Sequence, residues 1–301
     1  MKKKCSIKMH NWCKFQFKML KLQFLHPFHL VSESIWPFLQ SLSLMILLIG
    51  IIKYLNNDGL ELLFFGFILM VYNVVLWWRD VIRESSFQGF HNMIVMKGIK
   101  MGMILFIISE LFFFFSFFWA FFHMSLSPSI ELGMLWPPKG IELFNPFMIP
   151  LLNTSILLSS GVMLTVSHFG LLKKNVYYSE EYLKYTIYLG VIFSLFQIYE
   201  YYHANFTMSD SVYGSLFFML TGFHGLHVFI GTLFLMVMLF RMELKHFSKD
   251  HHVGFEASSW YWHFVDVVWL FLFLIVYWWI YYLFSMKNMF NFQLKDLINL
   301  K

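Results

Sequence analysis

Seven long apolar runs dominate this chain and restrict it to one class of fold. Each run has about 20 residues or more, which at 1.5 Å per residue is enough to cross the ~30 Å hydrocarbon core of a bilayer. The runs are continuously apolar, and backbone groups in lipid must be satisfied within the spanning segment, so each is predicted to be a helix. They cover residues 36–54, 60–78, 98–124, 146–172, 183–203, 212–241 and 262–283. The sequence therefore predicts an all-α polytopic membrane protein with seven transmembrane helices.

Composition and charge distribution support this class and give the chain an orientation. Hydrophobic residues make up 59% of the 301 residues and charged residues 13%, which excludes an ordinary soluble domain. Of the 22 Lys and Arg residues, 17 fall on the side of the N-terminus and 5 on the opposite side. By the positive-inside rule the N-terminus faces the compartment of synthesis, and an odd number of spans places the C-terminus opposite. No basic module typical of nucleic-acid binding is present, so we expect no nucleic-acid partner.

Glu110 is the only charged residue in the apolar run from Met101 to Phe122. It lies roughly 15 Å along the helix from Lys100, near the middle of the membrane. An ionisable residue at this depth predicts a functional carboxylate, either protonated or paired. The alternative is a neutral glutamic acid that hydrogen-bonds a neighbouring helix as packing glue.

Other ionisable residues within the runs have weaker signals. His224 and His227 lie on one helix face, but a single H-x-x-H and one His-His pair (His251 and His252) are too few for a membrane di-iron site. We therefore expect no metal in this chain, and hydrogen bonding as the role of His224 and His227. His263 and Asp266 share a helix face and are predicted to form a structural pair rather than a proton relay, and Glu200 is a further buried acid.

The densest polar cluster follows the second run. In chain order the cluster contains Trp78, Arg79, Asp80, Arg83, Glu84 and His91. Tryptophan favours head-group depth and arginine binds phosphate, so the cluster predicts a phospholipid site, with Arg241 as a further candidate on the same side. A surface ion-pair network, Arg79 with Asp80 and Arg83 with Glu84, explains the same residues equally well.

Seven longer motifs, in order along residues 26 to about 281, resemble one known family. They are HPFHLV (26–31), WWRDVIRE (77–84), GMILFIISELFFFFSFFWAFFH (102–123), ELGMLWPPKGI (131–141), PLLNTSILLSSG (150–161), YGSLFFMLTGFHGLHVFIGT (213–232) and HHVGFEASSWYWHFVDVVWLFLF (251–273). The chain is similar in all of them to mitochondrial cytochrome c oxidase subunit III. It departs from the usual pattern at Phe90-His91 and at His168-Phe169, where the family has two histidines.

The resemblance implies a non-catalytic subunit of an oxidase that transfers electrons from cytochrome c to oxygen and pumps protons. It implies the mitochondrial inner membrane, with the N-terminus in the matrix and the C-terminus in the intermembrane space. It also implies that helices 1–2 are separated from helices 3–7 by a V-shaped cleft filled with phospholipid, and that subunit I and other oxidase subunits are the partners. Haem and copper then belong to partner subunits, and this chain holds no cofactor except bound phospholipids.

Carried over by residue, the resemblance implies that Trp78, Glu84, His91 and Arg241 hold a lipid head group and that Glu110 is a reactive buried carboxylate. No residue is expected to be catalytic. The chain is then expected to divide into a basic N-terminal extension (1–25), helices 1–2 with the lipid-binding matrix loop (26–95), a five-helix bundle (96–285) and a C-terminal extension (286–301). The alternative functions are a histidine-ligated membrane redox enzyme and a secondary transporter, the latter disfavoured because no internal repeat is present.

Overall fold

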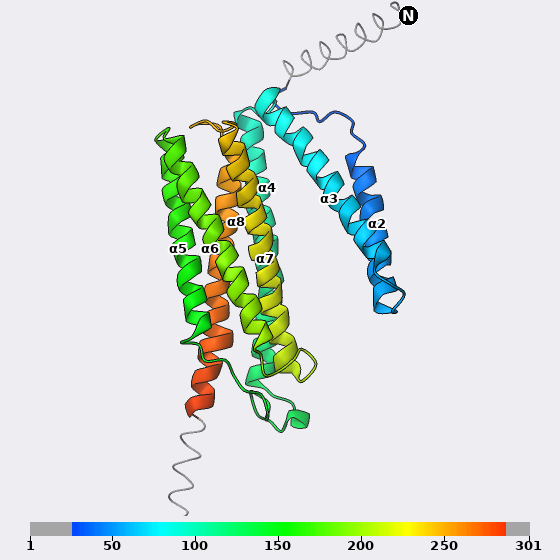
Figure 1. The fold of residues 1–301 in the computed structure, drawn as a ribbon, viewed down its shortest axis with the longest axis vertical. Helices are drawn as coiled ribbons and strands as arrows, with labels where there is room; N and C mark the ends of the chain where they lie inside the picture. Colours follow the sequence, from blue (N-terminus) through cyan, green and yellow to red (C-terminus); the bar gives the residue numbers. More distant parts are fainter. Residues whose placement is uncertain (1–25, 287–301) are drawn as a thin grey trace, which may run out of the picture. The chain divides into compact units, whose positions relative to one another are not determined.

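The computed structural model describes residues 26–286, and in that part of the chain it consists of helices and connecting loops without a β-strand (Figure 1). Seven long helices are present, which confirms the predicted all-α fold. They are α2 (Trp36–Leu55), α3 (Glu61–Ile82), α4 (Met93–Leu126), α5 (Ile149–Leu172), α6 (Val176–Tyr202), α7 (Val212–Glu243) and α8 (Val253–Leu272). A π-helical turn, η1 (Arg83–Phe87), continues α3, and π-helical turns, η3 (Phe273–Trp279), continue α8 toward Met286. The predicted N-terminal extension (1–25) lies outside the described residues, as does the C-terminal extension (286–301) beyond Met286.

Three helices begin earlier than the apolar runs predict. Helix α4 begins at Met93, α6 at Val176 and α8 at Val253, whereas the corresponding apolar runs begin at residues 98, 183 and 262. The runs counted only apolar residues, but a helix continues into polar turns when its first N–H groups are capped. The side chain of Asn92 accepts hydrogen bonds from the backbone N–H of Ile94 and Val95 at 3.1 and 3.0 Å. Asn175 caps α6 by accepting from the backbone N–H of Tyr178 at 3.3 Å, whereas α8 begins after His252 without a side-chain cap.

Six of the seven helices are long and apolar enough to cross a membrane. The exception is α6, which has 27 residues, eight of them tyrosine, and carries Glu180, Glu181 and Lys184 in its first turns. Its length of about 40 Å still exceeds the thickness of the hydrocarbon core. The tyrosines and charges lower its hydropathy without shortening the helix.

The chain divides into two compact units between Ile99 and Lys100. In the first, α2 and α3 form a hairpin (Figure 1). The helices touch at two glycines: a Cβ atom on Gly50 would lie 2.6 Å from the Leu63 Cα, and one on Gly66 would lie 2.7 Å from the Leu47 Cα. Only glycine allows the two backbones this approach, so the hairpin is joined by small residues while its large apolar side chains face outward.

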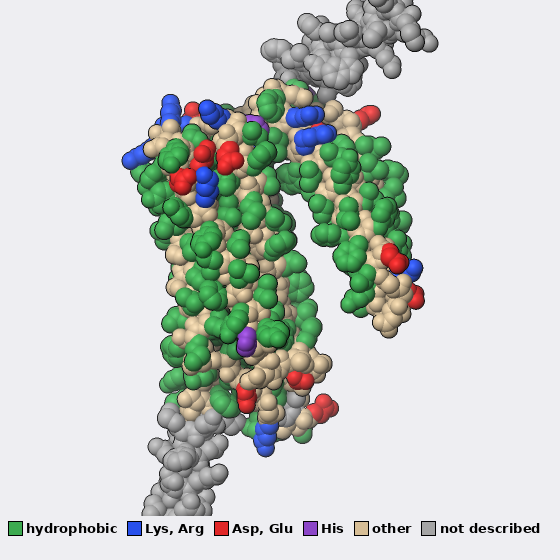
Figure 2. All heavy atoms as spheres, viewed as in Figure 1, with side chains coloured by type: hydrophobic (Ala, Val, Ile, Leu, Met, Phe, Trp, Pro, Cys, Tyr) green, Lys and Arg blue, Asp and Glu red, His purple; other side chains and the backbone are tan. Residues whose placement is uncertain are grey.

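The second unit contains α4 from Lys100 onward and the helices α5 to α8. Helix α5 packs on α6 and α8, and α7 packs on the same two helices, so the four enclose one core. Trp262 and Trp269 of α8 fill its centre, and their indole N–H groups donate to Ser160 Oγ and Thr154 Oγ1 of α5 at 2.9 and 3.0 Å. Figure 2 shows apolar side chains along the shafts of the helices and charged ones gathered at their ends, as a membrane requires.

Helix α4 differs from the rest of the second unit because little of it is covered by the chain. Only 11% of its most apolar window is buried, against 44% for α5 and 39% for α7. It joins the bundle through side chains such as Phe113, whose ring centroid lies 4.9 Å from that of Phe223 on α7. The opposite face of α4 exposes large apolar side chains, among them Phe112, Phe115 and Trp119.

Candidate functional site

Glu110 lies in the middle of α4 and pairs with a histidine of α7. Its Oε2 atom is 3.0 Å from Nε2 of His227. The His227 side chain is 8% exposed and that of Glu110 is 26% exposed, so the acid sits at the edge of the α4–α7 contact and the imidazole sits inside it. The rings of Phe114, Tyr261 and Phe264 lie around the imidazole. The structure thus brings together two residues 117 positions apart in the sequence.

The hydrogen bonds of His227 determine how this pair holds a proton. Nδ1 of His227 lies 2.6 Å from the carbonyl oxygen of Phe223, an acceptor, so Nδ1 carries a proton. In a neutral imidazole Nε2 is then bare, and Glu110 must carry the proton that joins the two groups. In the charged form the imidazolium donates to the carboxylate instead. In both forms one proton lies between Glu110 Oε2 and His227 Nε2, and the same bond fastens α4 to α7.

His224, one turn before His227, points elsewhere. Its Nε2 is 3.2 Å from the carbonyl oxygen of Val265 on α8, to which it donates, and its ring packs against Phe193 and Trp269. The two histidines of the H-x-x-H motif therefore contact different helices, each through its own hydrogen bond. This is the hydrogen-bonding arrangement that the sequence analysis predicted for them.

An acid that is fully buried lies between α6 and η3. The hydroxyl of Tyr277 donates to Glu200 Oε1 at 2.6 Å, and Glu200 is 1% exposed. Beside it, the Tyr201 and Thr221 hydroxyls are 2.6 Å apart. A π-helical turn holds one extra residue per turn compared with an α-helix and so changes which side chains face inward. Tyr277 lies within such turns.

The predicted pair of His263 and Asp266 is present but long. Nδ1 of His263 lies 3.7 Å from Asp266 Oδ2, and the Asp266 side chain is 8% exposed while that of His263 is 40% exposed. Gly161 of α5 leaves the room that Asp266 occupies, because a Cβ there would lie 2.7 Å from the same Oδ2 atom. Asp266 therefore faces α5 from inside the bundle.

The polar cluster after α3 is organised around Asp80. The indole N–H of Trp36 donates to Asp80 Oδ2 at 2.7 Å, and Arg79 binds Asp80 Oδ1 at 3.1 Å. Arg83 is 3.9 Å from the same oxygen and is exposed, as is Trp78. The ion-pair interpretation is thus correct for Arg79 with Asp80, but Arg83 pairs with Asp80 and not with Glu84. Asp80 and Arg83 are three positions apart, a spacing that places their side chains on the same helix face.

His91 and Arg241 are fixed by local contacts in their own units. The ring of His91 lies 5.7 Å from that of His29, which stacks on Phe90 at 5.0 Å. Arg241, at the end of α7, lies with its guanidinium 4.6 Å from the centroid of the Phe247 ring, a cation–π distance. Burial and the Arg241 charge lower the pKa of His246 in the loop that follows. Arg241 belongs to the five-helix unit, and the other predicted head-group residues belong to the α2–α3 unit.

Sequence reasoning singled out Glu110 and Glu200 but not their partners. His227 was assigned to hydrogen bonding without a partner, and Tyr277 was not considered. The sequence signal for the first pair was the H-x-x-H spacing of His224 and His227, which does not say which helix each histidine meets. Periodicity could not have found Tyr277, because its position depends on the π-helical turns.

Comparison with known proteins places the chain in a family. Residues 26–281 match the family model of cytochrome c oxidase subunit III. Cytochrome c oxidase subunit 3 of Rhipicephalus sanguineus is 56% identical over 254 residues, covering 84% of this chain and 99% of the relative. The proteins of the same name from Drosophila melanogaster and Pisaster ochraceus are 55% and 54% identical over 254 residues, again covering 84% of this chain and 97% and 98% of theirs. With its seven helices and this similarity across all of them, the chain belongs to the cytochrome c oxidase subunit III family and is a subunit of an oxidase complex.

Proposed function

We propose that this chain is the non-catalytic subunit of a mitochondrial inner-membrane oxidase that stabilises subunit I, holds phospholipids and supports proton uptake. In this proposal the N-terminus lies in the matrix, the C-terminus lies in the intermembrane space, and haem and copper are held by partner subunits. The Lys and Arg asymmetry supports the orientation. The family assignment supports the location.

The uncovered face of α4 supports a large partner surface. In the described part of the chain, Leu105, Phe112, Phe115 and Trp119 of this helix are each more than half exposed. Aromatic side chains of this size, on a helix the bundle covers on one side only, favour packing against another protein's helix rather than lipid alone. We infer that subunit I covers part of this face.

The pair of Glu110 and His227 carries the proposed role in proton uptake. It is an acid and a base that share one proton at mid-membrane depth, and the carboxyl end of the pair is the more exposed one. A group that can gain or lose a proton there can buffer protons on their way to a neighbouring chain. A hydrogen bond with a purely structural role needs only a donor and an acceptor, and it does not need a group that can titrate.

The substitution Glu110→Gln separates these roles because glutamine keeps the shape and can still hydrogen-bond His227 but cannot titrate. We expect a lower number of protons pumped per electron, or faster inactivation during turnover, with the complex still assembled. The matched control is Glu131→Gln, which removes an exposed carboxylate outside the long helices. Pumping and turnover lifetime equal to the wild type in Glu110→Gln would contradict the proposal.

The Asp80 cluster supports lipid binding at the end of α3. Arg79 is held by Asp80 at 3.1 Å, whereas Arg83 is 3.9 Å away and exposed beside the π-helical turn. The guanidinium of Arg83 can therefore donate hydrogen bonds to a phosphate. Glu84, His91 and the exposed Trp78 belong to the same unit. Arg241 is a second candidate cation, seated on Phe247.

Loss of either arginine should remove bound phospholipid. We expect Arg83→Ala and Arg241→Ala to lower the phospholipid that co-purifies with the complex, measured by lipid mass spectrometry. Arg241→Lys should lose part of it, since lysine keeps the charge without the planar fork. Lys53→Ala, at the other end of the α2–α3 hairpin, is the control. Full retention of lipid in both alanine variants would exclude the named site.

A further inference from the structure

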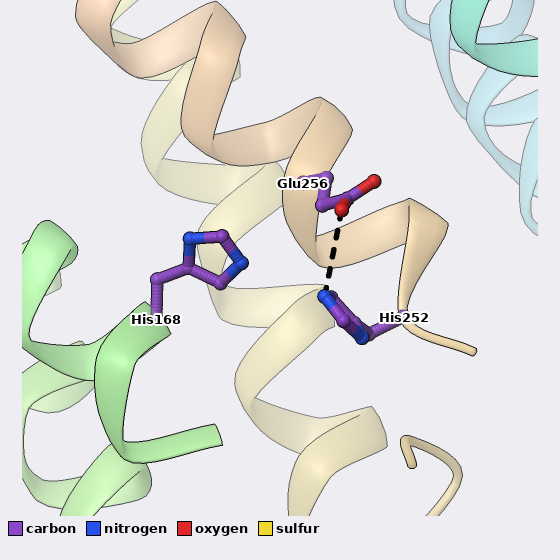
Figure 3. Close-up of side chains that lie close together, drawn as sticks. All are labelled: His168, His252 and Glu256. Atoms are coloured by element: carbon purple, nitrogen blue, oxygen red, sulfur yellow. Dashed lines mark ion pairs between the residues drawn. The ribbon is translucent and has the colours of Figure 1, made fainter. Parts of the chain in front are cut away.

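Three side chains that could bind a metal ion meet at one end of the five-helix unit (Figure 3). His168 comes from the last turns of α5, His252 directly precedes α8, and Glu256 lies in the first turn of α8. One ligand atom from each lies within 4.8 Å of the other two. The two imidazoles also pack edge to face, with their centroids 5.5 Å apart.

The local structure places these groups for reasons that the sequence explains. His252 and Glu256 are four positions apart, which puts their side chains on one face at the start of α8. A carboxylate in the first turn of a helix is favoured by the helix dipole. Helix α5 packs directly on α8, and His168 reaches the same space from its last turns.

The tautomer of His252 is determined by the backbone. Its Nδ1 lies 3.0 Å from the carbonyl oxygen of Ser248, an acceptor, so Nδ1 carries a proton. Metal-binding histidines hold their second nitrogen in this way, which leaves the lone pair of Nε2 directed at the ion. That Nε2 atom lies 3.5 Å from Glu256 Oε1.

Two nitrogens in this space are buried and make no hydrogen bond within residues 26–286: Nε2 of His168, and Nε2 of His252, which has the 3.5 Å ion-pair contact with Glu256. His252 itself is only 6% exposed. Buried polar atoms are normally satisfied, so such atoms need an explanation. A cation between the two nitrogens and Glu256 Oε1 would satisfy all three groups.

We propose that His168, His252 and Glu256 bind a divalent transition-metal ion at this end of the five-helix unit. The ligand types favour Zn²⁺. Two imidazoles and one carboxylate are a three-ligand set that Zn²⁺ accepts, with water in the fourth position. Ligand atoms around tetrahedral zinc lie about 3.3–3.5 Å apart, so the side chains must rotate inward from their present separation. His168 and Glu256 are partly exposed, which gives the ion a path from solvent.

Lys100 of α4 limits how tightly this site binds. Its ammonium forms an ion pair with Glu256 Oε2, the carboxylate oxygen that does not face His252. Glu256 can therefore bind the metal through Oε1 while Oε2 keeps Lys100. The nearby positive charge opposes a second cation, so removal of the charge should strengthen binding. The site then connects α4, α5 and α8 when the ion is present.

Anomalous scattering from the intact complex tests the proposal without a mutation. Chelator-treated complex is incubated with excess Zn²⁺, and data are collected on both sides of the zinc absorption edge. We expect an anomalous peak within about 2.0–2.2 Å of one atom from each of His168, His252 and Glu256. The absence of a peak at this position, with peaks at other surface sites as a positive control, would overturn the proposal.

Variants test which groups hold the ion. His168→Gln and His252→Gln should each weaken zinc binding at this site by more than the roughly 10–100-fold that loss of an outer partner costs. Lys100→Gln should strengthen it by about tenfold. His251→Gln is the matched control, since His251 adjoins the site but is not among the three ligands, and it should leave binding unchanged. Equal zinc stoichiometry and affinity in all four variants and the wild type would also overturn the proposal.

Discussion

The two units of this chain join their helices in opposite ways. In the α2–α3 hairpin the fully buried residues are small or polar: Ser43, Gly50, Gly66 and Asn73. In the five-helix unit the fully buried residues include Trp262, Trp269, Phe193 and Phe217. The hairpin brings two backbones together along its whole contact. The five-helix unit does so between α5 and α6, at Gly170 and Ser179, but it fills its centre with aromatic rings.

This difference decides where ionisable residues can be housed. Backbones in direct contact leave no interior, so the charged groups of the hairpin lie at its two ends, around Asp80 at one and beside the connecting loop, as Lys53, at the other. Helices held apart by aromatic rings leave space for Glu110, Glu200 and Asp266, each beside a histidine or tyrosine. Buried acids in a membrane protein thus need the second kind of packing, because only it can also house their partners.

The largest effect is expected from emptying the aromatic core. Phe193 is fully buried and lies edge to face on Trp269 with centroids 4.8 Å apart, so Phe193→Ala should cost about 3–5 kcal/mol. The measurement is the thermal denaturation of the purified complex, with loss of this subunit as the signal. Phe229→Ala is the matched control and should cost much less, because Phe229 of α7 is 58% exposed. Equal losses in the two variants would mean that the core is not the source of stability.

An intermediate effect is expected from separating the two backbones of the hairpin. Gly66→Ala places a Cβ atom 2.7 Å from the Leu47 Cα, so one helix must move, at a cost of about 1–3 kcal/mol. Protease cleavage in the loop of residues 56–59 should become faster. Gly102→Ala, which meets nothing within 4 Å in the chain, should leave cleavage unchanged. A hairpin as resistant as the wild type in Gly66→Ala would show that small residues are not required at this contact.

The smallest effect is expected from removing one donor of a buried acid. Tyr277→Phe leaves Glu200 Oε1 without the hydroxyl that donates to it at 2.6 Å, at a cost of about 1–2 kcal/mol. The shift in denaturation temperature of the complex measures it, and Tyr282→Phe, at a 52% exposed position, is the control. If both variants denature at the wild-type temperature, the hydrogen bond contributes nothing and Glu200 must be satisfied in another way.

Sequence reasoning found the helices and the rare acids, and it failed where partners had to be chosen. The seven runs correspond to seven helices, and α4, α6 and α8 begin five to nine residues before their runs because polar turns extend them, with a side-chain cap at α4 and α6. Asp80 was expected to bind Arg79, which it does, but Arg83 binds Asp80 as well rather than Glu84. Neighbours on one helix follow from spacing, whereas His227 as the partner of Glu110 does not.

The cluster of His168, His252 and Glu256 depends on tertiary packing as well as on spacing along the chain. The absence of a metal was predicted from the small number of histidine motifs, and it stays a prediction beside the site proposed above. The three side chains come from the end of one helix and the start of another, so no linear spacing reveals them. Only the packing of α5 on α8 brings them together.

Length and hydrophobicity determined from the sequence alone that this protein has seven long helices with rare acids inside their apolar runs. These properties act within each segment, since lipid forces every span to satisfy its own backbone. The tertiary structure decided which acid meets which base, because Glu110 and His227 are 117 positions apart and Glu200 and Tyr277 are 77 apart. Contacts at that separation depend on which faces the helices present to one another, and side-chain packing between helices determines those faces.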